Sequence, residues 1–252
     1  MNNKYELGKE MYLNGKSLCS ISKDLKISRG RFSTYLKKQG IEVKRLPHKK
    51  TIKENVFDKI DNEEKAYWLG FLYADGCIGN NNRTDIEIGL SVRDKSHIQK
   101  FKNFLNWDGK IVINDIKCRI SFKNRHMHQA LINLGCIPKK SLTLMFPNED
   151  KVPKELQRHF IRGYFDGDGC FCWTNKTFEI NIIGTKDMLE NICKITNIDK
   201  NRIYSAKTKS KEVYRIVVGE KQKIESFLDF IYANSNIYLD RKYEKYKKYK
   251  NL

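Results

Sequence analysis

Two nine-residue stretches decide the fold: residues 68–76 are WLGFLYADG, and residues 161–169 are IRGYFDGDG. When the stretches are aligned at their Asp-Gly ends, the residues that follow are cysteines in both, Cys77 and Cys170. Both stretches are apolar on nearly every side, which is typical of buried helices. Two copies are too few for a solenoid, so the repeat predicts a pseudo-symmetric pair within a single chain.

Small residues recur four positions apart in both stretches, as Gly70 and Ala74 and then as Gly163 and Gly167. A glycine inside a helix costs about 1 kcal/mol relative to alanine, so its repetition needs a structural reason. Close packing of two helix backbones supplies that reason, because a missing Cβ lets the helix axes approach. We therefore expect the two helices to pack against each other through these faces.

Helices packed in this way would bring Asp75 and Asp168 together at their C-terminal ends. Two carboxylates there repel each other and the negative ends of the helix dipoles, and a divalent cation removes that repulsion. Oxygen ligands without a nearby set of His and Cys favour Mg²⁺ over zinc, and Mg²⁺ beside a phosphodiester can activate water. A single Asp-Gly pair is more simply a helix stop, but two in the same helical phase predict an active site.

These stretches resemble the two motifs of a single-chain LAGLIDADG homing endonuclease, and the similarity covers roughly residues 60–250, including the inter-motif segment 137–147. The resemblance implies an α+β fold of two pseudo-symmetric αββαββα halves, with the motif helices at the centre and the strands forming a saddle over the DNA major groove. It also implies metal-dependent hydrolysis of both strands of double-stranded DNA at one long asymmetric site. We expect the chain to act as a monomer.

The last acidic residue of each motif binds the metal in this family, which implies a site at Asp75 and Asp168 together with the following glycines, Gly76 and Gly169. The implied cofactor is Mg²⁺, and we expect Mn²⁺ or Ca²⁺ to substitute for it in binding. Zinc-type spacings of Cys and His are not found here.

The resemblance is less complete at two points. Family members place a basic residue near each scissile phosphate, and our candidates are Lys123 and Lys221, which we expect near the ends of corresponding strands. The earlier acidic position of the motif is Asp166 in the second copy but Tyr73 in the first. Relatives that lost cleavage act on intron RNA as maturases or regulate transcription, so a non-cleaving nucleic-acid binder is the alternative function.

Residues 5–40 are expected to form three short helices, with Ser17 and Ser28 placed to cap the second and third. Two short helices joined by a tight turn form the helix-turn-helix pattern. Donors on the outer face of the third helix could reach base edges and phosphates in the major groove. The predicted DNA-binding residues of this helix are Arg29, Arg31, Thr34 and Lys37. A bundle used for packing or dimerisation is the alternative, and the basic face favours DNA.

Alternating apolar residues predict strands near residues 85–92, 117–123, 177–183 and 213–218. The polar faces of two of these strands are predicted to contact DNA through Lys117, Arg119, Lys123 and Arg215. We expect a helix-turn-helix domain at 1–45, a basic linker at 46–58, a first half at 59–148 and a second half at 149–252. The second half is expected to end in a basic helix whose tyrosines pack inward.

The charge balance points to a polyanionic partner. The 252 residues contain 49 Lys and Arg against 30 Asp and Glu, a net charge of +19. Residues 1–50 hold 13 of these cations against 4 acids, and residues 241–252 hold 6 against 1, so most of the surplus lies at the two ends. Nucleic acid is the partner that such a surplus favours.

The same composition excludes other classes of protein. No apolar run approaches the ~18 residues of a membrane span, which rules out an integral membrane protein. Seven scattered cysteines and no apolar leader predict reduced thiols in an unsecreted protein. We expect it in the cytoplasm or nucleoid of a bacterium or phage-infected cell, or in an organelle matrix, encoded by an intron or a free-standing gene.

Overall fold

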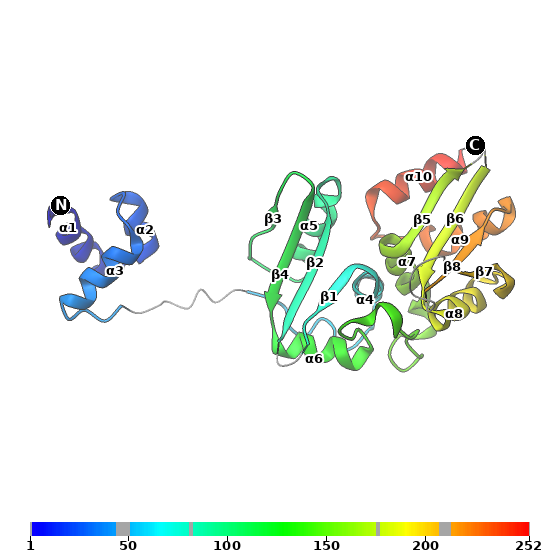
Figure 1. Ribbon diagram of the computed structural model, residues 1–252, viewed down its shortest axis with the longest axis horizontal. Coiled ribbons are helices and arrows are strands. Elements are labelled where there is room, and N and C mark those ends of the chain that lie inside the picture. The colour runs from blue at the N-terminus through cyan, green and yellow to red at the C-terminus, as the bar shows by residue number, and fades with distance from the viewer. Residues whose placement is uncertain (1, 44–50, 81–82, 175–176, 207–212, 252) are drawn as a thin grey trace. The chain divides into compact units, whose positions relative to one another are not determined.

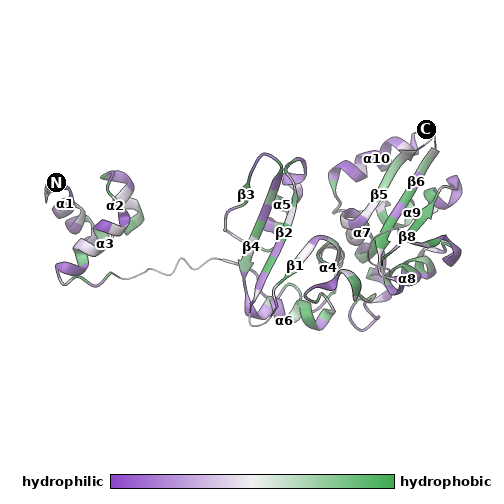
Figure 2. Cartoon of the chain, in the orientation of Figure 1, coloured by the Kyte–Doolittle hydropathy of each residue, from purple (hydrophilic) through white to green (hydrophobic). Residues whose placement is uncertain are grey.

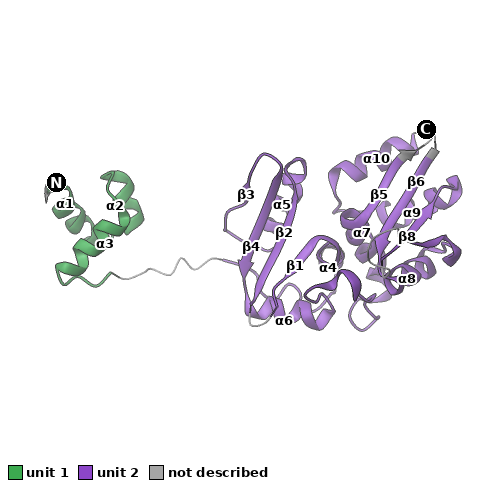
Figure 3. Ribbon diagram, in the orientation of Figure 1, with its two compact units in different colours: residues 1–49 green, residues 50–252 purple. Residues whose placement is uncertain are grey.

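The structure is a computed structural model, and it describes residues 2–43, 51–80, 83–174, 177–206 and 213–251 (Figure 1). These residues form two compact units, Met1–Lys49 and Lys50–Leu252, each with its own hydrophobic core (Figure 3). Among the described residues, no helix has the length and apolarity needed to cross a membrane.

The N-terminal unit consists of three helices, α1 (Asn2–Leu13), α2 (Leu18–Asp24) and α3 (Arg29–Lys38). Its core is small because the helices are short, and it is built on Ile21, Phe32 and Leu36, which are fully buried. The Ser17 side chain accepts a hydrogen bond from the Ser20 N–H and so caps α2, as its position predicted. Ser28 occupies the N-cap position of α3, but its side chain makes no capping hydrogen bond.

The linker expected at 46–58 is shorter than predicted. Residues 46–50 lie outside the described residues, but residues 51–58 belong to the second unit. The Phe57 side chain is fully buried, and Val56 is nearly so. The Lys53 N–H donates to the Leu105 carbonyl at 2.8 Å. The apolar side chains of Val56 and Phe57, which lie in a polar stretch of sequence, therefore pack into the core of the second unit.

The second unit contains two halves with the same order of elements. The elements of the first half are α4 (Glu63–Asp75), β1 (Gly76–Ile78), β2 (Asp85–Ser91), α5 (Lys95–Phe104), β3 (Val112–Ile113), β4 (Lys117–Lys123) and α6 (Arg125–Leu134). Those of the second half are α7 (Gln157–Asp168), β5 (Gly169–Thr174), β6 (Thr177–Gly184), α8 (Lys186–Thr196), β7 (Ile203–Ser205), β8 (Tyr214–Val218) and α9 (Lys221–Tyr232), followed by α10 (Asp240–Lys250). The predicted α+β class with two pseudo-symmetric halves and a small N-terminal helical unit is confirmed.

The two sheets share one topology. The strand orders are β1-β2-β4-β3 and β5-β6-β8-β7, and every pairing is antiparallel. The registers also correspond at the start of each sheet, where Gly76 pairs with Ile88 and Gly169 pairs with Ile182. In each half the motif helix therefore enters the first strand directly at the glycine that follows its last aspartate.

One face of each sheet is covered by helices, and the other is open. In β4, Cys118, Ile120 and Phe122 are buried while the residues between them are exposed, which is the period that predicted the strand. Hydrophobic and hydrophilic residues accordingly alternate along β4 in Figure 2. Helix α5 packs against β2 and β4, and α8 and α9 pack against β6 in the second half (Figure 1). The open faces are left to carry the polar side chains.

The motif helices α4 and α7 pack on each other at the centre of the second unit, as their small residues predicted. A Cβ added to Gly70 would lie 2.0 Å from the Phe160 carbonyl oxygen, and one on Gly163 would lie 2.0 Å from that of Tyr67. A Cβ on Gly167 would lie 2.3 Å from the Ala74 Cβ. Glycine is therefore required for this separation of the two backbones.

Candidate functional site

The candidate site lies at the C-terminal ends of α4 and α7, where Asp75 and Asp168 are the last helical residues. The next residues, Gly76 and Gly169, donate their N–H groups to the carbonyls of Leu72 and Phe165 and turn the chain into extended backbone. A Cβ on Gly76 would lie 2.5 Å from the Leu72 carbonyl oxygen, so the turn has room only for glycine. Each carboxylate is thus fixed at the junction of a helix and a strand.

The tight packing of the helices brings the two carboxylates together. A Cβ on Gly167 would lie 3.3 Å from Asp75 Oδ2, so the Asp75 side chain reaches the second motif helix. Burial, followed by repulsion from Asp75, raises the pKa of Asp168 to about 6. Burial also raises the pKa of Asp75, while Lys242 and Lys140 oppose the increase. Protein atoms surround much of the Asp168 carboxylate, but the residue still has solvent-accessible surface, so water screens part of this repulsion.

These two carboxylates fit a hard divalent cation. Oxygen ligands that destabilise each other's charge are stabilised by Mg²⁺, which usually takes one or two carboxylates and fills its other positions with water and phosphate oxygens. Within the described ranges, no group of three or more His, Cys, Asp or Glu side chains is placed to hold a metal ion. A site of this kind would therefore be completed by the substrate, with Asp75 and Asp168 as its protein ligands.

Two lysines outside the predicted site, Lys140 and Lys242, reach the ends of the motif helices. The Lys140 ammonium donates a hydrogen bond to the Gly76 carbonyl. The Lys242 ammonium, on α10, donates to the carbonyls of Phe165 at 2.6 Å and Asp166 at 2.9 Å, and also to that of Gly169. Burial lowers the pKa of Lys242 to about 8. A signal for Lys140 was available in the inter-motif segment 137–147, which contains it.

Of the two lysines predicted as catalytic, Lys123 lies away from the two aspartates along the first sheet. Lys123 is at the far end of β4, where it pairs with Asp85 and forms an ion pair with it at 3.8 Å. The site is at Gly76, which pairs with Ile88 on β2. Lys123 pairs with Asp85, three residues away from Ile88 on the same strand, so Lys123 is displaced from the site along the sheet. Lys221 is the first residue of α9 and follows the end of β8 at Val218, so its expected place near a strand end is confirmed, while its catalytic role stays a prediction. The cations that act on the two aspartates are Lys140, Lys242 and Arg241.

The predicted DNA-contacting residues are all exposed. Lys117, Arg119 and Lys123 alternate along the open face of β4, and Arg215 is exposed on β8. In the N-terminal unit, the residues proposed to face DNA are exposed on α3, namely Arg29, Arg31, Thr34 and Lys37. Arg119 also forms an ion pair with Glu87 at 3.7 Å, and this pairing reduces the free positive charge of the first sheet.

The earlier acidic position of the motif does not face the candidate site. Asp166 is 1 % exposed, and its carboxylate accepts hydrogen bonds from the Tyr67 hydroxyl at 2.8 Å, the Tyr232 hydroxyl at 2.6 Å and the Leu239 N–H at 2.7 Å. Burial raises its pKa, and these donors oppose the increase. Its counterpart Tyr73 is also buried and donates to the Leu134 carbonyl at 2.7 Å. Both residues therefore serve packing.

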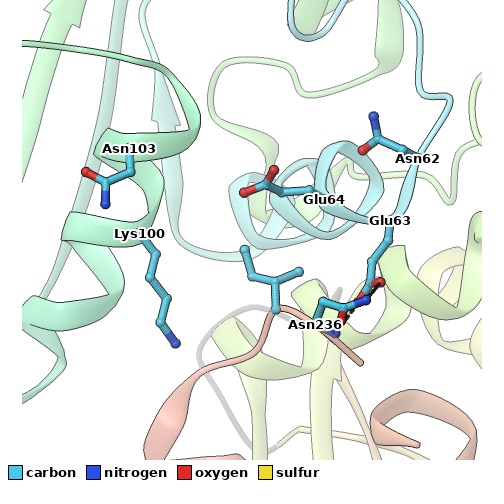
Figure 4. Close-up of a pocket in the computed structure, with 7 residues that line it drawn as sticks. Asn62, Glu63, Glu64, Lys100, Asn103 and Asn236 are labelled. Atoms are coloured by element: carbon cyan, nitrogen blue, oxygen red, sulfur yellow. Dashed lines mark hydrogen bonds between the residues drawn. The ribbon is translucent and has the colours of Figure 1, made fainter. Parts of the chain in front are cut away.

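A separate pocket lies at the opposite end of α4 (Figure 4). Both carboxylate oxygens of Glu63 accept hydrogen bonds there, from the backbone and side-chain nitrogens of Asn236. The buried Arg162 guanidinium donates to the same Glu63 side chain at 2.6 Å. Since Glu63 begins the helix that Asp75 ends, this pocket is distinct from the candidate site, and Glu63, one of its two acidic residues, already binds internal partners.

Comparisons with known proteins agree with this geometry. The family model described as the WhiA LAGLIDADG-like domain matches residues 157–251. The I-LtrWI LAGLIDADG homing endonuclease bound to target DNA is similar with a TM-score of 0.52 and 15% identity, over 75% of this chain and 89% of that one. The LAGLIDADG homing endonuclease I-GzeII in complex with its DNA target has a TM-score of 0.50 and 12% identity, over 76% and 89%. The chain therefore has the LAGLIDADG homing-endonuclease fold.

Two curated relatives come from Methanocaldococcus jannaschii. A probable translation initiation factor IF-2 is 29% identical over 208 residues, which is 73% of this chain and 17% of that protein. A replication factor C small subunit is 27% identical over 192 residues, which is 70% of this chain and 10% of that protein. The chain thus spans only a small part of the length of either relative, and their activities do not transfer to it.

Proposed function

We propose that this protein is a site-specific endonuclease that hydrolyses both strands of double-stranded DNA with a divalent metal ion. The observation that carries the proposal is the convergence of Asp75 and Asp168 at the ends of two helices held together by glycines. Packing alone does not explain this arrangement, because each carboxylate raises the free energy of the other's charged form. The LAGLIDADG fold, shared with endonucleases solved on DNA, supports the same reaction class.

Different residues would bind the metal ion, the scissile phosphate and the DNA backbone. Asp75 and Asp168, deprotonated, would hold Mg²⁺. When bound, such an ion supplies a more acidic water and stabilises negative charge on the leaving oxygen. Lys140 lies beside this pair and can donate a hydrogen bond to a phosphate oxygen. The exposed cations of the open sheet face, such as Lys117 and Arg119, would bind the backbone on either side.

The N-terminal unit would extend the contact with DNA. Its third helix exposes Arg29, Arg31 and Lys37, which suit the major groove and the flanking phosphates. A unit with a core of its own can bind without altering the cleavage site. We expect removal of residues 1–45 to weaken binding and to flatten its dependence on salt, because fewer phosphates are neutralised, while the cutting chemistry stays in place.

A direct experiment tests this function. The DNA that flanks the reading frame, joined across the element, gives a candidate target for a supercoiled plasmid. The purified full chain should linearise that plasmid with Mg²⁺ and not with EDTA, while a plasmid of scrambled target sequence stays intact. Binding to the target without any cutting in Mg²⁺ or Mn²⁺ would contradict the proposal.

A non-cleaving DNA-binding regulator is the second candidate, and a specific observation favours it. The family model that matches residues 157–251 is WhiA-like, and the WhiA family is a non-cleaving DNA-binding regulator. Retention of both Asp75 and Asp168 favours the nuclease, because a binder needs neither carboxylate. The plasmid assay separates the two, and a binding assay with the corresponding intron RNA tests the maturase form of this alternative.

A further inference from the structure

Lys242 is committed to the backbone of α7. An ammonium group has three N–H donors. Three carbonyl oxygens accept from Lys242 Nζ, those of Phe165 at 2.6 Å, Asp166 at 2.9 Å and Gly169. The residue is 3 % exposed. Its donors are therefore all engaged, and none is left for a water molecule or a phosphate oxygen.

Lys140 occupies the corresponding place at the end of α4, but it makes fewer hydrogen bonds than Lys242 and is less buried. Its ammonium donates one hydrogen bond within the described residues, to the Gly76 carbonyl, and its side chain is only partly buried. Two donors remain available to a ligand. Lys140 also belongs to a short turn, Lys140–Leu142, and not to a packed helix.

The second half is built to hold Lys242 where it is. Asp166 fixes the Leu239 N–H at 2.7 Å just before α10 begins. Arg241, adjacent to Lys242, donates through Nε to both carboxylate oxygens of Asp94 at 3.0 Å. Withdrawing Lys242 toward DNA would break its hydrogen bonds to three carbonyl groups, of which that of Phe165 keeps another donor, the Gly169 N–H, and would remove a cation from the negative end of the α7 dipole. Lys242 is therefore held in place as a helix cap and is not free to contact a phosphate.

We propose that the two halves contribute unequally to cleavage: Lys140 contacts the scissile phosphate of one strand, whereas Lys242 remains a helix cap, so the strands are cut at different rates and a nicked duplex accumulates. This inference rests on the proposed nuclease function. In each cut, a water oxygen bonds to phosphorus, the bond from phosphorus to the leaving oxygen breaks, one water proton is lost and the leaving oxygen gains one. Lys140 stabilises the negative charge of the phosphate during this exchange by donating a hydrogen bond, and it is not consumed.

The test follows each strand separately. A duplex target labelled at a different end on each strand is cut by excess full-length protein in Mg²⁺, so that differences in affinity do not enter. The wild type should cut one strand about tenfold faster or more, since loss of one electrostatic donor costs at least that much. Lys140→Met should slow the faster cut and bring the two rates together, with an unchanged melting temperature. Lys139→Met, an exposed neighbour of equal charge, is the matched control and should preserve the strand bias.

Lys242→Met should lower the melting temperature by several degrees, because a buried cap is lost, while Lys242→Arg restores part of that loss. Equal rates for the two strands in the wild type would overturn the inference and leave the nuclease function standing. An unchanged melting temperature in Lys242→Met, together with loss of the slower cut, would overturn it as well. Binding without any metal-dependent cutting would instead overturn the proposed nuclease function, so the two failures are distinguishable.

Discussion

The two halves of the second unit match in topology but differ at the earlier acidic position of the motif and in the lysine that reaches each helix end. Both keep the glycine of closest approach and the terminal aspartate, Gly70 with Asp75 and Gly163 with Asp168. At the earlier acidic position, one half has Tyr73 bonded to a carbonyl, and the other has Asp166 bonded to three donors. Symmetry is thus kept where helix packing and the carboxylate pair need it and is lost where each half packs its own segments.

Asp166 carries the largest predicted difference between the halves. Asp166→Leu leaves the Tyr67 hydroxyl, the Tyr232 hydroxyl and the Leu239 N–H without their acceptor, at a cost of about 3–6 kcal/mol in unfolding free energy. The equivalent change in the first half, Tyr73→Phe, removes one hydrogen bond and should cost about 1–2 kcal/mol. Urea unfolding measures both, and similar losses would show that the two positions are equivalent after all.

The glycine positions should behave alike in the two halves. Gly70→Ala and Gly163→Ala each force a Cβ to within 2.0 Å of a backbone carbonyl oxygen on the facing helix. The helices must separate, and we expect each variant to lose about 3 kcal/mol of stability. Gly30→Ala in the N-terminal unit is the control, because an added Cβ there meets nothing within 4 Å among the described residues. A mild effect in one half only would disprove the symmetric packing.

His97 gives a smaller effect that depends on pH and belongs to the first half alone. Burial lowers its pKa to about 3, and the Tyr67 hydroxyl, which donates to Asp166, must accept from its Nε2–H. The folded pKa is below the unfolded value of about 6.5, so the unfolded chain takes up the proton first. The stability that neutral His97 provides is present above pH 6.5 and is lost as the pH falls toward 3.

At pH 5 this titration should reduce the stability of the wild type by about 2 kcal/mol relative to pH 7. His97→Gln keeps a donor for Tyr67 and does not titrate, so the gap between wild type and variant should shrink by that amount between the two pH values. Parallel stability curves would show that His97 is not buried in its neutral form.

Much of the fold could be predicted from the sequence because its signals are local. The repeated glycines predicted the contact of α4 with α7, and alternation predicted β2, β4, β6 and β8. The short strands β1, β3 and β7 were missed, since two or three residues carry no detectable period. Helix α8 was also not predicted, although Thr185 caps it.

The candidate site was only partly predictable. Asp75 and Asp168 stand out because the motif repeats, but Lys140 and Lys242 reach their carbonyls from 64 and 73 residues away. Such contacts depend on how distant segments pack against each other, and this packing cannot be inferred from the spacing or the charge of the residues. Lys123 and Lys221 were chosen because they lie near strand ends, and that placement is right, but the end of β4 at Lys123 is not the end of the sheet that the motif helix enters. Nothing in the sequence indicates that the carbonyls of Gly76 and Gly169 accept hydrogen bonds from lysines.

If Asp75 and Asp168 form the metal-dependent site, they are needed for cutting and not for binding. Single-turnover cleavage of the flank-joined target in Mg²⁺, with binding measured in parallel, tests it in Asp75→Asn and Asp168→Asn. We expect each variant to bind the target as the wild type does and to lose double-strand cleavage by about 100-fold or more. Wild-type cleavage rates in both variants would contradict it.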